Sequence, residues 1–160
     1  MNACRDGAIQ VLEVCKAGGL MVATAESCTG GLVAAALTAI PGSSSVVDRG
    51  FVTYSNAAKA QMLGVPMALI DTHGAVSEQV ARAMAEGALD HSQAHVAVAV
   101  TGVAGPDGGS ADKPVGLVHF AAARRDGAVI ARHRIFAGDR DAVREQSVVF
   151  ALALLEQAAR

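Results

Sequence analysis

The stretch at residues 20–40, LMVATAESCTGGLVAAALTAI, combines a strand, a tight turn and a helix in direct succession. The opening LMVATA is an apolar run typical of a buried strand, and LVAAALTAI has the composition of a helix that the following proline and glycine end. Between the two, the turn ESCTGG brings two hydroxyls and a thiol to the carboxyl end of the strand: Ser27, Cys28 and Thr29. This succession predicts an α/β fold with its chemistry at the junction.

The rest of the chain alternates helix and strand patterns. Helices are expected over residues 4–16, over a short segment that Ser55 or Asn56 caps, from Ser77 onward, and over 139–160, and further strands are expected within 43–54 and 94–100. Residues 115–138 read as a hairpin, with Asp126 and Gly127 at its turn. We therefore predict one domain over residues 1–160, a three-layer α/β/α arrangement with a mixed sheet that includes a C-terminal β-hairpin.

Composition limits the classes of partner. Hydrophobic residues make up 52% of the chain, charged residues 18%, and the formal net charge is -2. This balance predicts no nucleic-acid partner and no anionic membrane partner, and it favours a small molecule. No apolar run reaches the roughly 18 residues of a membrane-spanning helix, and three cysteines without a signal-peptide pattern predict the cytoplasm. The alanine and glycine content favours a homo-oligomer built through flat helix faces.

The turn ESCTGG suits the binding of negative charge. The first N–H groups of a helix have no partner inside the helix, and the helix dipole is positive there. We therefore expect the amides around Thr29, Gly30 and Gly31 to hold an anion or a developing oxyanion. The alternative is purely structural: Ser27 or Thr29 caps the helix, and the glycines permit a tight turn.

Ser27 needs a base before it can attack a carbonyl group at neutral pH. The five histidines carry no local motif, and the other candidate is Lys59, in a short helix just after a strand that ends at Tyr54. A lysine acts as a base only if burial or a nearby cation lowers its pKa, and the alternative for Lys59 is a solvated position on the helix surface. Cys28 is the rival nucleophile, because a helix N-terminus activates a thiolate.

A second glycine-rich segment, TGVAGPDGGSADKP at residues 101–114, also follows a strand. Its amides are expected to face the first glycine-rich turn, because the ends of parallel strands gather ligands at one sheet edge. Arg140 and Arg144, four residues apart, form a possible phosphate clamp or a solvated pair. No His, Cys, Asp or Glu spacing suggests a metal site, so neither a metal nor a cofactor is expected.

Several long segments together resemble the CinA C-terminal domain family: TAESCTGGLVAAALT, GSSSVVDRGFVTYSNAAKAQMLGV, HGAVSEQVA, TGVAGPDGGSADKPVGLVHFA and GDRDAVRE. The resemblance implies deamidation of nicotinamide mononucleotide to nicotinate mononucleotide and ammonia, a step in pyridine nucleotide salvage. It also implies a serine and lysine pair. By position in these motifs, the pair is Ser27 and Lys59, Tyr54 orients or relays, and Thr101 fits the family pattern.

The mechanism expected from this pair is acyl transfer through Ser27, with Lys59 as the base, the 29–31 amides around the oxyanion, and Gly102, Gly105 and Arg140 near the phosphate. Two other functions stay open on the sequence. One is a non-catalytic nucleotide-binding or competence-associated module, and the other is an amidase for a different small carboxamide.

Overall fold

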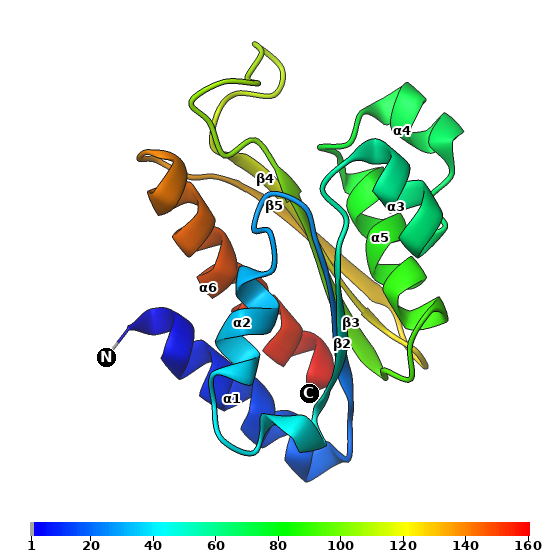
Figure 1. The fold of residues 1–160 in the computed structure, drawn as a ribbon, viewed down its shortest axis with the longest axis vertical. Coiled ribbons are helices and arrows are strands. Elements are labelled where there is room, and N and C mark those ends of the chain that lie inside the picture. The colour runs from blue at the N-terminus through cyan, green and yellow to red at the C-terminus, as the bar shows by residue number, and fades with distance from the viewer. Residues whose placement is uncertain (1) are drawn as a thin grey trace.

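The computed structural model describes residues 2–160 and contains a five-stranded mixed sheet in the order β2-β1-β3-β4-β5 (Figure 1). The strands are β1 Val22–Glu26, β2 Val47–Val52, β3 Val96–Gly102, β4 Leu117–Arg124 and β5 Val129–Ile135. The helices are α1 Ala3–Gly18, α2 Leu32–Thr38, α3 Asn56–Leu63, α4 Met67–His73, α5 Glu78–Asp90 and α6 Arg140–Ala159, with a 3-10 turn at Ser43–Ser45. The first three strands pair in parallel, and β4 and β5 continue the sheet as antiparallel strands.

Helices cover both faces of the sheet, with α1, α2 and α6 on one side and α3, α4 and α5 on the other (Figure 1). The strands divide their side chains by size. Larger residues face α1 and α6: Val22, Val96, Val98, Val100, Val118 and Phe120. Alanines face α5: Ala23, Ala25, Ala97, Ala99, Ala121 and Ala123. Side chains alternate between the two faces along a strand, so the larger ones fill the layer between the sheet and helices α1 and α6. The alanines on the other face let α5 pack close to the sheet.

The predicted α/β fold with helices on both sides of a mixed sheet is confirmed. The expected caps are present: the side chains of Ser55, Ser77 and Asp139 accept the N–H groups of Ala58, Val80 and Ala142. Two details differ from the sequence prediction. The short helix α4 was not expected, and Thr101 and Gly102 belong to the end of β3 rather than to the loop that follows.

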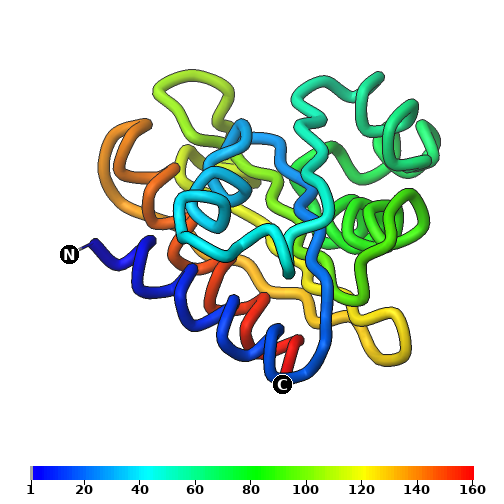
Figure 2. Tube along the Cα trace, turned by 60° about the horizontal axis from the view of Figure 1, so that its bottom comes forward, coloured from blue at the N-terminus to red at the C-terminus, as the bar shows by residue number. Residues whose placement is uncertain are grey.

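The parallel strands bring their carboxyl ends to a single edge of the sheet. Glu26 at the end of β1 pairs with Val52 of β2 and Val100 of β3. Figure 2 shows the turn after β1, the segment 103–116 and the start of α6 at the same end of the molecule. The two glycine-rich segments therefore lie at one edge, as the sequence predicted. Within residues 2–160, no helix has both the length and the apolar character needed to cross a bilayer.

Candidate active site

Ser27 and Lys59 meet at the carboxyl edge of the sheet. Ser27 follows β1 directly, and Lys59 lies in α3, which begins soon after β2, so the parallel pairing of the two strands brings both residues together. Lys59 Nζ lies 3.0 Å from Ser27 Oγ. Lys59 is 1% exposed and Ser27 is 8% exposed. A lysine and a serine 32 positions apart thus form a buried hydrogen-bonded pair.

Lys59 Nζ donates three hydrogen bonds. Its Nζ donates to the carbonyl oxygens of Thr53 at 3.0 Å and Tyr54 at 3.2 Å. Its third donated bond goes to Ser27 Oγ at 3.0 Å, and the Ser27 hydroxyl donates to the Tyr54 carbonyl oxygen at 3.5 Å. On loss of one proton, a Lys59 that keeps its two carbonyl partners turns its lone pair to the Ser27 hydroxyl. Burial lowers the pKa of Lys59, while the nearby Cys28 thiol opposes this change. The surroundings therefore favour the form of Lys59 that acts as a base.

The pair opens into a cavity of about 230 Å³. The cavity is lined by Ser27, Cys28, Tyr54, Asn56, Lys59, Ala75, Val76, Thr101, Gly102, Ala104 and Arg140. Six residues predicted from the sequence are therefore brought together: Ser27, Lys59, Tyr54, Thr101, Gly102 and Arg140. No histidine of the described chain lines this cavity, which leaves Lys59 as the basic side chain beside the serine.

Two other predicted residues of the cavity lining, Thr101 and Arg140, hold neighbouring segments. Thr101 Oγ1 donates to the carbonyl oxygen of Ala75 at 2.8 Å. Arg140 donates from Nη1 to the carbonyl oxygen of Gly105 at 2.9 Å and from Nη2 to Tyr54 Oη at 3.1 Å. The phenol of Tyr54 thus contacts Arg140, whereas its main-chain carbonyl contacts Lys59. Gly105 does not line the cavity itself but meets it through Arg140.

In the turn after Ser27 and the start of α2, several N–H groups that could bind an anion are already hydrogen-bonded within the chain. The buried carboxylate of Glu26 accepts the Thr29 hydroxyl at 2.7 Å and the N–H groups of Val33 and Ala34 at 2.8 and 3.0 Å. The Gly30 N–H donates to the Ser27 carbonyl oxygen at 3.0 Å. The first free amides of α2 are therefore occupied by a carboxylate of the chain itself.

Thr29, Gly30 and Gly31 lie outside the cavity lining, and the Gly30 amide is already paired. The N–H groups of Thr29 and Gly31 donate to no acceptor within residues 2–160. Positive φ angles of 58° and 105° at Gly30 and Gly31 explain the two glycines, because other residues rarely adopt this conformation. The turn therefore retains unpaired amides, although fewer than the sequence suggested.

Two residues of the site, Glu26 and Asn56, were not singled out for it from the sequence, and Arg144 was expected there only as one arm of a phosphate clamp. Glu26 holds the turn, Asn56 lines the cavity, and Arg144 donates to the carbonyl oxygens of Cys28 at 3.1 Å and Thr29 at 3.3 Å. Arg144 therefore contacts main chain, and it does not share the cavity with Arg140 as a two-arginine clamp requires. Glu26 and Asn56 lie inside the ESCTGG and YSNAAK motifs, which was the available signal.

Cys28 is a poor nucleophile in this environment. Burial raises the pKa of its thiol to about 11, although Arg144 and Lys59 act in the opposite direction. The thiol is therefore protonated near neutral pH, and a protonated thiol reacts slowly. Within residues 2–160, no cluster of three or more His, Cys, Asp or Glu side chains is placed to hold a metal ion.

Comparisons with known proteins agree on a single family. A family model described as the CinA C-terminal domain matches residues 6–159. The chain is 56% identical over 148 residues to the nicotinamide-nucleotide amidohydrolase PncC of Escherichia coli strain K12, covering 92% of this chain and 90% of that protein. It is also 56% identical over 144 residues to the protein of the same name from Enterobacter agglomerans, covering 90% of this chain and 88% of that protein.

The fold is also that of solved structures. The crystal structure of the competence/damage inducible protein CihA from Agrobacterium tumefaciens superposes with a TM-score of 0.97 at 52% identity. The superposition covers 100% of this chain and 98% of that one.

Proposed function

The chain belongs to the CinA C-terminal domain family, and we propose that it is an amidohydrolase that converts nicotinamide mononucleotide and water to nicotinate mononucleotide and ammonia. The observation that carries this proposal is the buried contact of 3.0 Å between Lys59 Nζ and Ser27 Oγ at the wall of a cavity. A serine hydroxyl beside a lysine of lowered pKa is the arrangement that acyl transfer requires. The names of the relatives supply the substrate class.

The reaction proceeds in two halves. Lys59 takes the proton of Ser27, and Ser27 Oγ attacks the carboxamide carbon to form a tetrahedral oxyanion. Lys59 then gives that proton to the leaving nitrogen, the carbon–nitrogen bond breaks, and ammonia departs from an ester on Ser27. A water molecule passes a proton to Lys59 and attacks the ester, and Ser27 leaves with the proton returned. Nicotinate mononucleotide is released, and Lys59 is neutral again.

The oxyanion needs donors that are already oriented before the attack. Within residues 2–160, the turn amides that donate to no acceptor are those of Cys28, Thr29 and Gly31, and we assign this role to the amides of Thr29 and Gly31. Loss of one such donor slows turnover by about 10²–10³-fold in serine hydrolases. Because this interaction strengthens only as charge develops, its loss lowers kcat more than it changes KM.

The phosphate of the substrate is assigned to Arg140, which lines the same cavity as Lys59. Its present partners are neutral oxygens, the Gly105 carbonyl and the Tyr54 phenol. A doubly charged phosphate is a stronger acceptor than either and can take the guanidinium in a bidentate manner. Gly102 also lines this cavity. A side chain at this position would collide with Val118 and with the Leu117 carbonyl oxygen. Tyr54 is then a positioning residue, holding Lys59 by its carbonyl and Arg140 by its phenol.

The proposal is tested by measuring ammonia release from nicotinamide, its riboside and its mononucleotide. Ser27→Ala and Lys59→Met should each abolish release from the mononucleotide, while circular dichroism shows an intact fold. Lys16→Met is the matched control, because Lys16 is exposed in the last turn of α1 and should leave the rate unchanged. Undiminished release by Ser27→Ala would contradict the mechanism, and nucleotide binding without ammonia release would favour a binding module instead.

A further inference from the structure

The residues that carry the nucleophile form a β-turn. The Gly30 N–H donates to the Ser27 carbonyl oxygen at 3.0 Å, which closes a turn of four residues. This hydrogen bond uses the carbonyl of the first residue and the N–H of the last. The central peptide group, between Cys28 and Thr29, therefore keeps both its carbonyl and its N–H for other partners.

A guanidinium from α6 occupies the carbonyl side of that peptide group. Arg144 donates from Nε to the Cys28 carbonyl oxygen at 3.1 Å and from Nη2 to the Thr29 carbonyl oxygen at 3.3 Å. These two contacts link residues 116 and 115 positions apart, so they depend entirely on the packing of α6 beside the turn.

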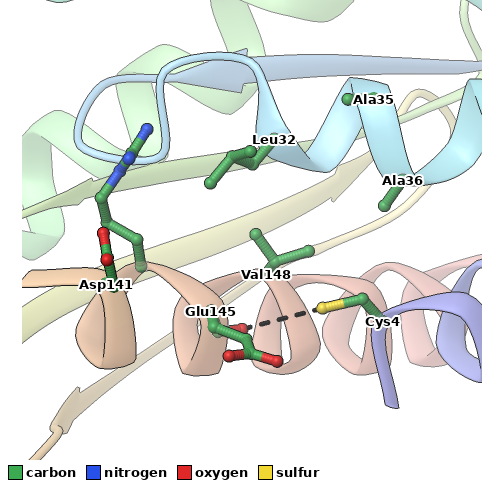
Figure 3. Close-up of a pocket in the computed structure, with 8 residues that line it drawn as sticks. Cys4, Leu32, Ala35, Ala36, Asp141, Glu145 and Val148 are labelled. Atoms are coloured by element: carbon green, nitrogen blue, oxygen red, sulfur yellow. Dashed lines mark hydrogen bonds between the residues drawn. The ribbon is translucent and has the colours of Figure 1, made fainter. Parts of the chain in front are cut away.

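Arg144 reaches the turn from outside the catalytic cavity. It lines a groove of about 530 Å³ between α2 and α6, where Leu32 and Val148 face one another (Figure 3). Among residues 2–160, this groove and the catalytic cavity have no lining residue in common. Cys28 lines the cavity. The turn therefore separates the guanidinium on one side from the reacting groups on the other.

Because the Cys28–Thr29 peptide is planar, fixing its carbonyl also fixes the direction of its N–H. The Cys28–Thr29 bond is trans, and in a trans peptide the carbonyl and the N–H point in opposite directions. With the Cys28 carbonyl held on Arg144, the Thr29 N–H points away from the guanidinium. That N–H has no acceptor within residues 2–160.

We propose that Arg144 is a positioning residue that holds the Cys28–Thr29 peptide group with the Thr29 N–H directed at the oxyanion. This inference rests on the proposed acyl transfer at Ser27. The positive charge on the carbonyl side also polarises the peptide group, which strengthens the N–H as a donor. Arg144 thus acts on the reaction through the main chain and does not touch the substrate.

The opposite side of the turn is held independently. Glu26 accepts the Thr29 hydroxyl at 2.7 Å and is itself fully buried. Thr29 is therefore anchored through its side chain by Glu26 and through its carbonyl by Arg144. Loss of Arg144 removes the contacts to the Cys28 and Thr29 carbonyl oxygens but leaves the Glu26 anchor, so the turn should stay formed while its central peptide group becomes free to rotate.

The test compares steady-state kinetics of Arg144→Met with Arg125→Met. Arg125 also donates to main-chain carbonyl oxygens, those of Leu89 and Ala94, but it follows β4 at the opposite end of the sheet. Both variants lose a guanidinium that binds main chain, so both should unfold at lower temperature. Only Arg144→Met should lower kcat, on the order of tenfold to a hundredfold, with KM for nicotinamide mononucleotide within about twofold of wild type.

Other results would overturn the assignment. Unchanged kcat in Arg144→Met, or an equal loss in Arg125→Met, would reduce Arg144 to a stabilising residue. A rise in KM without a fall in kcat would make it a phosphate-binding residue. If Arg144→Met does not fold, Arg144→Lys decides: it keeps the charge but cannot bind both carbonyls in the same way, so a lower kcat at constant KM supports the inference. Failure of both variants to fold overturns it.

The same assays separate this inference from the proposed function. A wild-type enzyme that releases no ammonia, or an active Ser27→Ala variant, would remove the acyl-transfer mechanism itself. Active wild type, inactive Ser27→Ala and fully active Arg144→Met would remove only the role of Arg144.

Discussion

Replacing Glu26 by glutamine tests how firmly the turn that carries Ser27 is anchored. The Glu26 carboxylate is fully buried and accepts three hydrogen bonds, from Thr29 Oγ1 at 2.7 Å, Val33 N at 2.8 Å and Ala34 N at 3.0 Å. A glutamine has nearly the same shape but only one carbonyl oxygen. It can keep two of these bonds as neutral ones, and it directs an NH₂ group at the third donor.

The free energy of unfolding should fall by about 3 kcal/mol. Two hydrogen bonds change from charge-assisted to neutral, which costs about 1 kcal/mol each. The Ala34 N–H loses its acceptor, which costs a further 1–3 kcal/mol or so. The negative charge at the N-terminus of α2 is also lost, at about 0.5 kcal/mol. Burying a neutral amide costs less than burying a carboxylate, so this difference stabilises the variant. It keeps the expected loss of unfolding free energy near the lower end of the range that these contributions give.

Urea denaturation at neutral pH, followed by circular dichroism, measures this change against Ser77→Ala. Ser77 caps α5 by accepting the Val80 N–H at 3.2 Å and donates to the Gly74 carbonyl oxygen at 2.8 Å. Both bonds are neutral, and replacing a serine cap by alanine costs about 1 kcal/mol. Glu26→Gln should therefore shift the midpoint to clearly lower urea than Ser77→Ala. A loss no greater than that of Ser77→Ala would refute the view that the Glu26 charge secures the turn.

Three further predictions concern the base, the thiol and the packing of α5. Activity should rise with pH along an acid limb, because Lys59 accepts a proton only when neutral and burial lowers its pKa; a kcat/KM profile whose limb lies at the ordinary lysine pKa would contradict this. Cys28→Ala should keep wild-type turnover, since its thiol, with a pKa of about 11, is protonated at neutral pH, and loss of ammonia release would give the thiol a role. Gly87→Ala should lower the free energy of unfolding by about 3 kcal/mol, because the added Cβ overlaps the Leu63 carbonyl oxygen. The control is Gly18→Ala, whose added Cβ makes only ordinary contacts and should change the free energy of unfolding by less than about 1 kcal/mol. Equal shifts in the unfolding temperature of the two variants would argue against close packing at Gly87.

Much of the fold followed from local signals. The caps at Ser55, Ser77 and Asp139 and the turn at Asp126–Gly127 each depend on residues within a few positions of one another. The helix α4 had no such signal. It is seven residues long, begins after Pro66 and has a single fully buried side chain, Ile70, so its formation depends on packing against α5.

The site divides in the same way. Ser27 and Lys59 were each named as candidates from their positions after a strand, and the resemblance to the family paired them. In the structure, the parallel pairing of β1 and β2 brings the two residues together. Glu26 was not predicted, and Arg144 was predicted only as part of a phosphate clamp, because the main-chain groups that both residues bind carry no residue-specific signal. The Glu26 carboxylate accepts α2 amides that could otherwise bind an anion, and the sequence of the turn does not predict this either.

Taken alone, the order of residues determined the alternation of strands and helices, the caps, and the positions of a serine and a lysine each soon after a strand, since these depend on short-range hydrogen bonding and on the periodicity of apolar side chains. Only the tertiary structure decided that Lys59 is buried with two carbonyls as acceptors, that Glu26 occupies the start of α2, and that Arg144 holds the turn from α6. Burial and the pairing of distant polar groups arise when the layers pack together, and they determine whether a lysine is a solvated cation or a base.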